Sequence, residues 1–137
     1  MTEKTKTLTN DKRTIGITSA NEKNLAALVL AGNFGSELDA AKFALAYAIR
    51  NDVSAGTAEG TNTKWNIGTV DGDGSLKSVV EAVFDGVAEP YRLIEYLINE
   101  GLTRLGSDDA IPPDVVGILF QADQRGRSQD NKNGKTE

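Results

Sequence analysis

The residue types that carry most enzyme and metal chemistry are absent from this chain. It contains no histidine and no cysteine, which excludes Ser–His–Asp and Cys–His constellations, thiolate metal sites and disulfides within the chain. Aspartate, glutamate, lysine and tyrosine are the residue types left for acid–base work. We therefore expect a chain that is not an enzyme and that holds no metal and no cofactor.

The most suggestive acidic motif is Asp71-Gly72-Asp73-Gly74-Ser75. A calcium loop of the EF-hand type needs glycine at loop position 6 and glutamate at position 12. Counted from Asp71, those positions hold Leu76 and Ala82, so the motif fails where its specificity lies. The alternative is a turn that leads into a helix capped by Ser75.

Carboxylates and aromatic residues give weaker indications. Trp65 and Tyr91 could stack on a base, but a lone tryptophan in a loop more often fills the edge of a core. Paired carboxylates can do acid–base work, whereas a position on the polar side of a helix predicts a solvated face. That second interpretation is favoured for Glu81, Glu89, Glu95 and Glu100.

Bulk composition predicts one cytoplasmic domain. A length of 137 residues suits a single core without a staple. Residues 1–11 and 123–137 are polar and are expected to be disordered tails around a helical domain at 12–122. No apolar run is long enough for a membrane span, and the first ten residues have no signal-peptide core.

Net charge is −5 but unevenly spread. Residues 1–14 hold four basic and two acidic side chains, and residues 123–137 hold four basic and three acidic. The middle therefore keeps seven of the fifteen basic residues and fifteen of the twenty acidic residues. An acidic body with mildly basic ends can touch DNA only locally.

The pattern of the first fifty residues predicts a strand and two helices. Residues 13–18 alternate apolar and polar, as a short strand does. Ser19 with Glu22 three residues later forms a capping box for a helix that Gly32 ends. Its apolar stripe is Leu25, Leu28 and Val29.

Ser36 caps a second helix that runs to about Arg50, with Asp39 in its first turn. This helix is apolar nearly all round, which predicts burial in the core and a subunit interface as well. Ala40, Ala44 and Ala46 fill much of the rest of its surface and permit close backbone approach.

The second half predicts a loop and further helices. Residues 53–63 read as a loop and residues 64–70 as a short extended segment. A helix headed by Ser75 carries the stripe Leu76, Val79, Val80, Val83 and Phe84. Another begins at Pro90 and ends at Gly106, with the stripe Tyr91, Ile94, Leu97, Ile98, Leu102 and Leu105. After a stop at residues 111–113, residues 115–120 predict a short apolar helix that docks on the body. The fold class is mainly α: a short N-terminal strand followed by four to five helices.

The order strand, helix, Gly/Ser turn, helix over residues 13–50 resembles a ribbon–helix–helix module. In that family the strands of two subunits pair into a ribbon that reads bases in the major groove. Alternation puts Ile15 and Ile17 inward, so the resemblance makes the outward residues base readers. The DNA-binding candidates are Lys12, Arg13, Thr14, Gly16 and Thr18 on the strand, with Gly35 and Ser36 holding a phosphate at the second helix. Thr14, Gly16 and Thr18 are shorter than the usual readers.

A looser likeness covers residues 18–105. The helix pair, the loop with Lys64-Trp65-Asn66-Ile67-Gly68 and the final helix ending Glu100-Gly101-Leu102-Thr103-Arg104-Leu105 are similar to DndE, a family of small DNA-phosphorothioation proteins. This resemblance implies a DNA-associated protein, dimeric or higher, of a DNA-modification or defence-type system in bacteria or phage.

Two other functions stay open. The chain could be an acidic protein–protein assembly subunit without nucleic-acid contact, using its apolar helices. An enzyme based on Asp and Glu is a third alternative, disfavoured because no nucleophile–base pair is present. The DNA hypothesis depends on one geometric point. The strand at residues 13–18 must pair with a second copy of the chain across a two-fold axis.

Overall fold

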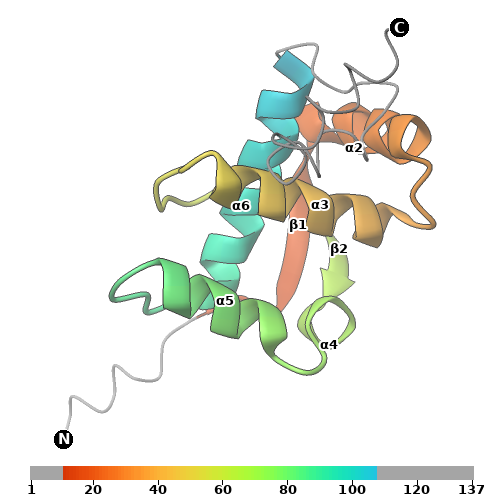
Figure 1. Ribbon diagram of the computed structural model, residues 1–137. Coiled ribbons are helices and arrows are strands. Elements are labelled where there is room, and N and C mark those ends of the chain that lie inside the picture. Colours follow the sequence, from red (N-terminus) through yellow and green to blue (C-terminus); the bar gives the residue numbers. More distant parts are fainter. Residues whose placement is uncertain (1–10, 108–137) are drawn as a thin grey trace, which may run out of the picture.

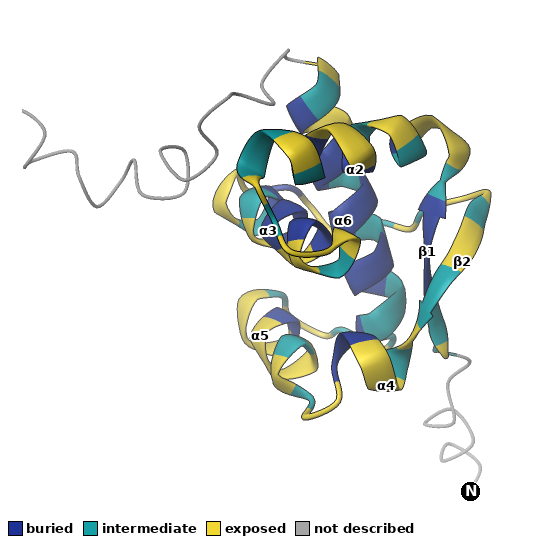
Figure 2. Ribbon diagram, turned by 90° about the vertical axis from the view of Figure 1, so that its right-hand side faces the viewer, coloured by how far each residue is buried: buried dark blue, intermediate teal, exposed yellow. Residues whose placement is uncertain are grey.

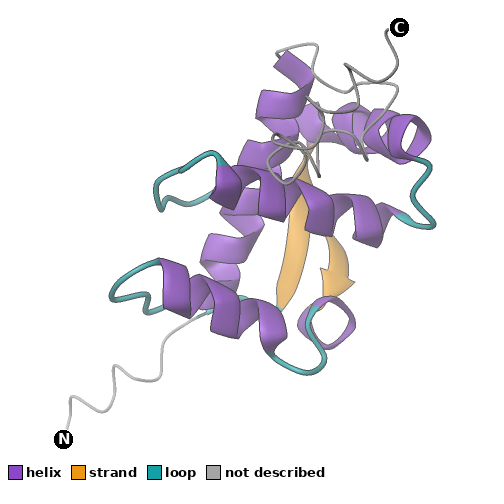
Figure 3. Cartoon of the chain, in the orientation of Figure 1, coloured by secondary structure: helices purple, strands orange, loops and turns teal. Residues whose placement is uncertain are grey.

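A computed structural model describes residues 11–107 of the chain. Within them the fold is mainly helical, with one two-stranded sheet near the start (Figures 1 and 3). The fold class expected from the sequence is confirmed. The elements are β1 Thr14–Thr18, α2 Ser19–Gly32, α3 Glu37–Arg50, β2 Thr61–Asn66, α4 Ile67–Val70, α5 Ser75–Val83 and α6 Pro90–Ser107.

The long helix α6 organises the molecule. It packs against α3, β1, α2 and α5, and it crosses behind α3 in Figure 1. Burial follows this arrangement: in Figure 2 the middle of α6 is dark blue, whereas β2 and α5 are mostly yellow or teal. The stripe predicted for this helix is buried as expected, except that Tyr91 is half-buried; the buried members are Ile94, Leu97, Ile98, Leu102 and Leu105.

The start of α6 is held by an acidic side chain from outside the helix. Pro90 is its first residue, as predicted. The carboxylate of Asp11 accepts hydrogen bonds from the backbone N–H groups of Tyr91 (3.0 Å) and Arg92 (2.9 Å). A helix start normally leaves four N–H groups unpaired; Pro90 has none, so three remain here and Asp11 satisfies two of them.

The helices α3 and α6 approach closely at one pair of small residues. A Cβ added at Gly101 would lie 2.1 Å from the backbone oxygen of Ala44. Ala40, Ala44 and Ala48 are completely buried, whereas Ala46 is exposed. Three of these alanines therefore serve contacts within the chain, and they do not need the subunit interface that the sequence suggested.

Helix starts confirm one predicted cap and correct two. The Ser36 hydroxyl accepts a hydrogen bond from the backbone N–H of Asp39 (3.1 Å), as expected. Ser19 does not cap α2, because it is already helical and the N-cap Thr18 makes no side-chain cap bond. Ser75 likewise lies inside α5, whose N-cap is Gly74 at φ 76°.

Two further boundaries differ from expectation. The extended segment begins earlier and ends earlier than residues 64–70, because β2 covers Thr61–Asn66 and the next four residues form α4. The left-handed residue that ends α2 is Asn33, at φ 56°, one position after Gly32. The predicted stop at 111–113, the helix at 115–120 and nearly all of both predicted tails lie outside the described residues.

Candidate functional site

The strand β1 pairs with β2 of the same chain. The two strands are antiparallel, with Thr14 opposite Asn66 and Thr18 opposite Thr61. A register shift lies between Ile15 and Gly16. The expectation that this strand pairs with a second copy is therefore wrong, and one of its two edges is already occupied.

Polar side chains of α6 occupy the other edge of β1. The Gly16 N–H donates to a carboxylate oxygen of Glu95 (2.8 Å), and the Thr18 N–H donates to the amide oxygen of Asn99 (3.0 Å). The Asn99 amide nitrogen in turn donates to the Gly16 carbonyl oxygen (3.1 Å). Backbone groups that a ribbon would offer to a second subunit are thus used inside the chain.

Glu95 is the largest departure from the sequence-based interpretation. It is 1% exposed, so its expected place on a solvated face is wrong. Its carboxylate pairs with the Lys12 ammonium (3.0 Å) and accepts from the Thr61 hydroxyl (3.0 Å). A buried charge needs such partners, because desolvation is otherwise prohibitive.

A buried amide network continues along the same side of α6. Asn21 of α2 donates to the backbone oxygen of Asn99 (3.0 Å) and to the hydroxyl of Thr103 (3.1 Å). Asn24 donates to the side-chain oxygen of Asn21 (2.8 Å). Glu95, Asn99 and Thr103 stand four residues apart, and this polar stripe on an otherwise apolar helix is the signal that could have revealed the network.

The strand candidates for DNA contact are placed unequally. Ile15 and Ile17 point inward as predicted, but Gly16 is buried as well. A Cβ on Gly16 would lie 2.7 Å from the Asn62 backbone oxygen, so β2 covers this position. The expectation that Gly16 faces outward is wrong.

The remaining strand candidates are only partly accessible. Lys12 is bound to Glu95, while Thr14 and Thr18 are half-buried. The Thr14 hydroxyl lies 3.4 Å from the hydroxyl of Thr63. Arg13 alone among the strand candidates is exposed. β1 therefore offers no row of outward side chains for reading bases.

The candidate phosphate anchor at the start of α3 is exposed but acidic. Gly35 and Ser36 are both exposed, and the Ser36 hydroxyl is engaged by the helix itself. Glu37 and Asp39 lie in the first turn, where their charges compete with a phosphate for the helix dipole. Lys64 pairs with Glu37 (2.8 Å) and Glu22 (3.2 Å), and the hydrogen bond with Glu37 is the main cause of a raised Lys64 pKa.

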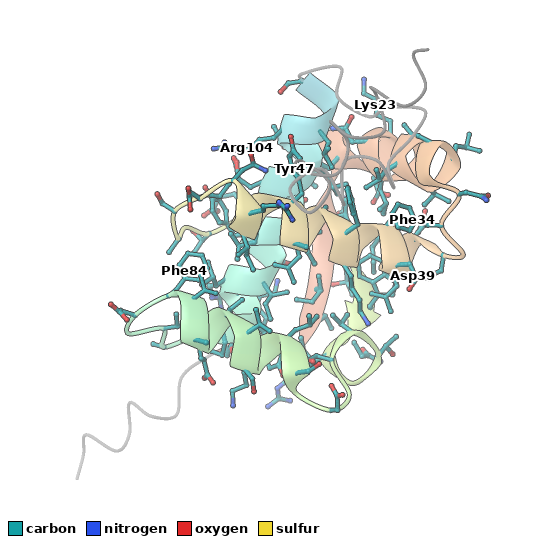
Figure 4. All side chains as sticks on the ribbon, viewed as in Figure 1. Lys23, Phe34, Asp39, Tyr47, Phe84 and Arg104 are labelled. Carbon is teal, nitrogen blue, oxygen red and sulfur yellow. The ribbon has the colours of Figure 1, made fainter. Side chains whose placement is uncertain are left out.

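A cleft of about 330 Å³ lies near the C-terminal end of α3, away from the candidate phosphate anchor at its start. It opens between the loop after α3 and the segment that joins α5 to α6, and Figure 4 labels Phe84 on this side. Its lining is mostly apolar and includes Phe84, Val87 and Leu93. The Arg92–Glu89 ion pair (2.8 Å) stands at its polar edge.

The helix α5, which leads into this cleft at its C-cap Phe84, leaves an apolar face uncovered. Val80 is fully buried, but Val79 is 45% and Val83 51% exposed. The prediction that both belong to a buried stripe is therefore wrong. Val79 and Val83 stand one helical turn apart, with the exposed Ala82 between them. We call these three residues, together with the cleft, the α5 face.

Two carboxylates, Asp85 and Glu89, line the cleft part of the α5 face. Glu81 and Asp85 are exposed, and Glu89 is half-buried at the cleft. Lys77 is an exposed cation on the same helix. With Arg92 also in the lining, the charged groups of the cleft sum to −1, which favours a cationic partner over an anionic one.

The face is positioned by Asp71 and Tyr91. The Asp71 carboxylate, 5% exposed, accepts from the backbone N–H groups of Leu76 (2.8 Å) and Lys77 (3.0 Å) and so caps α5. It also accepts from the Tyr91 hydroxyl of α6 (2.8 Å). Burial, followed by this hydrogen bond, raises the pKa of Tyr91 to about 12.

Residues 11–107 contain no group of three or more acidic side chains that could hold a metal ion. Among the same residues, no helix is both long and apolar enough to cross a membrane. Trp65 of β2 is half-buried against the core. Comparisons of the chain with family models, curated proteins and solved structures gave no match.

Proposed function

We propose that this chain is a non-catalytic interaction subunit, and that its α5 face binds a cationic segment of a partner protein that carries an apolar anchor. The observation that supports this most strongly is the exposure of Val79 and Val83 on the helix that leads through Phe84 into an apolar cleft, whose lining includes the carboxylates of Asp85 and Glu89. Single exposed apolar residues are common. Two on one turn, next to a concave apolar surface, form a typical anchor site.

The apolar and the charged residues of the α5 face have different roles in binding. Burying the two valines and filling the cleft with one large side chain supplies affinity, since apolar burial contributes about 25 cal/mol per Å². Asp85 and Glu89 in the lining accelerate encounter with a cationic segment and disfavour an anionic one. The cleft volume, about 330 Å³, is at the small end for a ligand pocket and suits a side chain better than a cofactor.

DNA is the competing partner, and β1 gives it little support. The strand has both edges occupied within the chain, and its central reader position is buried. Carboxylates flank the α3 start and the α5 face alike. A phosphate backbone would meet unfavourable charge at both places.

The test uses the full chain and a defined probe: a fluorescent helical peptide of leucine and lysine, with its leucines on one face. We expect binding at physiological salt, measured by anisotropy. Val83→Asp should weaken it about tenfold, because a charge in the contact forfeits roughly the 1.4 kcal/mol that a hot-spot residue contributes. Ala46→Asp, which adds the same charge at an exposed position of α3, should bind like the parent.

Equal affinity of Val83→Asp and Ala46→Asp would overturn the proposal. A mobility-shift assay at low salt covers the alternative. Retardation of a DNA duplex that Arg13→Glu abolishes would establish the nucleic-acid function instead. Arg13 is the cleaner substitution for this purpose, because Lys12 also neutralises the buried Glu95.

A further inference from the structure

Helix α2 carries a second uncovered apolar face, away from the core. Leu25 and Leu28 fill the core side, whereas Leu30 is 81% exposed. Around Leu30 lie further exposed residues at helical spacing, of which Lys23 alone is charged; the apolar ones are Ala20, Ala26 and Ala27. We call this set the α2 outer face. A helix with apolar residues on both sides normally has neighbours on both sides.

The described chain ends beside this face. The described part of α6 ends at Ser107, and a Cβ on Gly106 would lie 2.4 Å from the side chain of Asn24 on α2. The last turn of α6 therefore lies against the middle of α2. The α5 face is at the other end of α6, roughly 27 Å away along an 18-residue helix.

The next part of the sequence is strongly apolar. Residues 111–120 contain six large apolar side chains: Ile111, Val115, Val116, Ile118, Leu119 and Phe120. From Ser107 to Val115 an extended chain spans at most roughly 26–29 Å. That exceeds the roughly 21 Å length of the 14-residue α2, so this segment can reach any part of the α2 outer face.

The charges near the α2 outer face are opposite in sign to those that precede and enter the apolar segment. Lys23 and Arg104 are exposed at this end of the molecule (Figure 4), and neither forms an ion pair with a residue in the range 11–107. The following sequence carries Asp108, Asp109 and Asp114. Opposite charges placed this way favour a single docking orientation.

We propose that residues 111–120 of the same chain bind the α2 outer face and cover Leu30. This contact completes the core at the C-terminal end of α6 and leaves the α5 face as the open surface. It does not depend on the proposed function, because the two faces lie on different helices.

The test is paramagnetic relaxation in the full chain. The absence of cysteine makes Ala122→Cys a unique site for a nitroxide label directly after the segment. We expect the label to broaden the amide resonances of Ala27 and Leu30 and to leave those of Val79 and Val83 sharp. Leu30 is 81% exposed among the described residues, so Leu30→Asp should leave the fold of residues 11–107 in place while it abolishes the broadening. The matched change Val79→Asp should not abolish it.

A second sample identifies the source of the contact. Isotope-labelled chain without nitroxide is mixed with unlabelled chain that carries it. Sharp resonances in this mixture show that each chain covers its own α2. Broadening of Ala27 and Leu30 in the mixture would mean that a second copy is the occupant and would overturn the proposal. Broadening at α5, or nowhere, would overturn it as well.

Discussion

Two regions of this molecule reverse the usual placement of polar and apolar groups. Between β1 and α6, the polar side chains of Glu95 and Asn99 are buried and paired with backbone and side-chain partners. On α5, Val79 and Val83 are apolar and face solvent. The first region is closed because the Glu95 carboxylate, the Asn99 amide and the N–H groups of Gly16 and Thr18 all have partners. The second remains open because nothing in residues 11–107 covers it. The partner that we propose would bind at this open region.

The largest effect is expected where the closed region is broken. Glu95→Ala removes the carboxylate and leaves the Lys12 ammonium, the Gly16 N–H and the Thr61 hydroxyl without it. Unfolding free energy measured in urea should fall by about 3–5 kcal/mol. Glu95→Gln keeps an acceptor for the Gly16 N–H and should cost less. A loss below about 1 kcal/mol for the alanine variant would show that Glu95 behaves as an exposed residue.

The tight crossing of α3 and α6 gives the next effect. An alanine normally stabilises a helix by about 1 kcal/mol over glycine, but at position 101 its Cβ meets the Ala44 backbone oxygen. Gly101→Ala should therefore lower the unfolding free energy by about 1–3 kcal/mol. Gly68→Ala in α4, with nothing within 4 Å of the new Cβ, serves as control. Equal stability of the two variants would contradict the close crossing.

Tyr91, which ties α6 to the start of α5, predicts a pH dependence. Its pKa is raised to about 12 in the folded chain, above the ordinary value of about 10. Above pH 10 the unfolded state loses this proton while the folded state keeps it, so stability falls between pH 10 and pH 12. Below pH 10 the contribution is fully present. Urea titrations across this range should show a steeper decline for the parent than for Tyr91→Phe. Parallel curves would mean that the raised pKa is absent.

The smallest effect is expected on the open region. Val79→Ser and Val83→Ser replace apolar side chains that are about half exposed, so each should change stability by no more than about 0.5 kcal/mol. Thermal unfolding followed by circular dichroism measures this. A loss of 2 kcal/mol or more, of the size typical for core residues, would place these valines in a buried contact and remove the basis of the α5 face.

Local patterns in the sequence were sufficient for β1 and for the longer helices α2, α3, α5 and α6, but not for the four-residue α4. The 3.6-residue period of α6, Pro90 at its start and Ser36 before α3 each act within one or two turns, and such short-range signals predict structure directly. The class of fold followed from them.

Long-range pairing could not be obtained this way. Gly16 and Glu95 are 79 residues apart, and an alternating strand pattern predicts a strand without saying what pairs with it. The same limit applied to α5, where an apolar stripe was assumed to be buried. Val79 and Val83 show that periodicity identifies an apolar face but not its occupant.

We infer that the backbone groups on both edges of β1 are hydrogen-bonded within one chain, to β2 on one edge and to α6 on the other. Site-resolved hydrogen exchange of the Gly16 and Thr18 amides tests it most directly, because these two N–H groups donate to Glu95 and Asn99. We predict slow exchange of both amides, with the same protection in dilute and concentrated solution. Rapid exchange on dilution, with protection that returns as the protein concentration rises, would show that a second copy supplies the partner and would contradict this account.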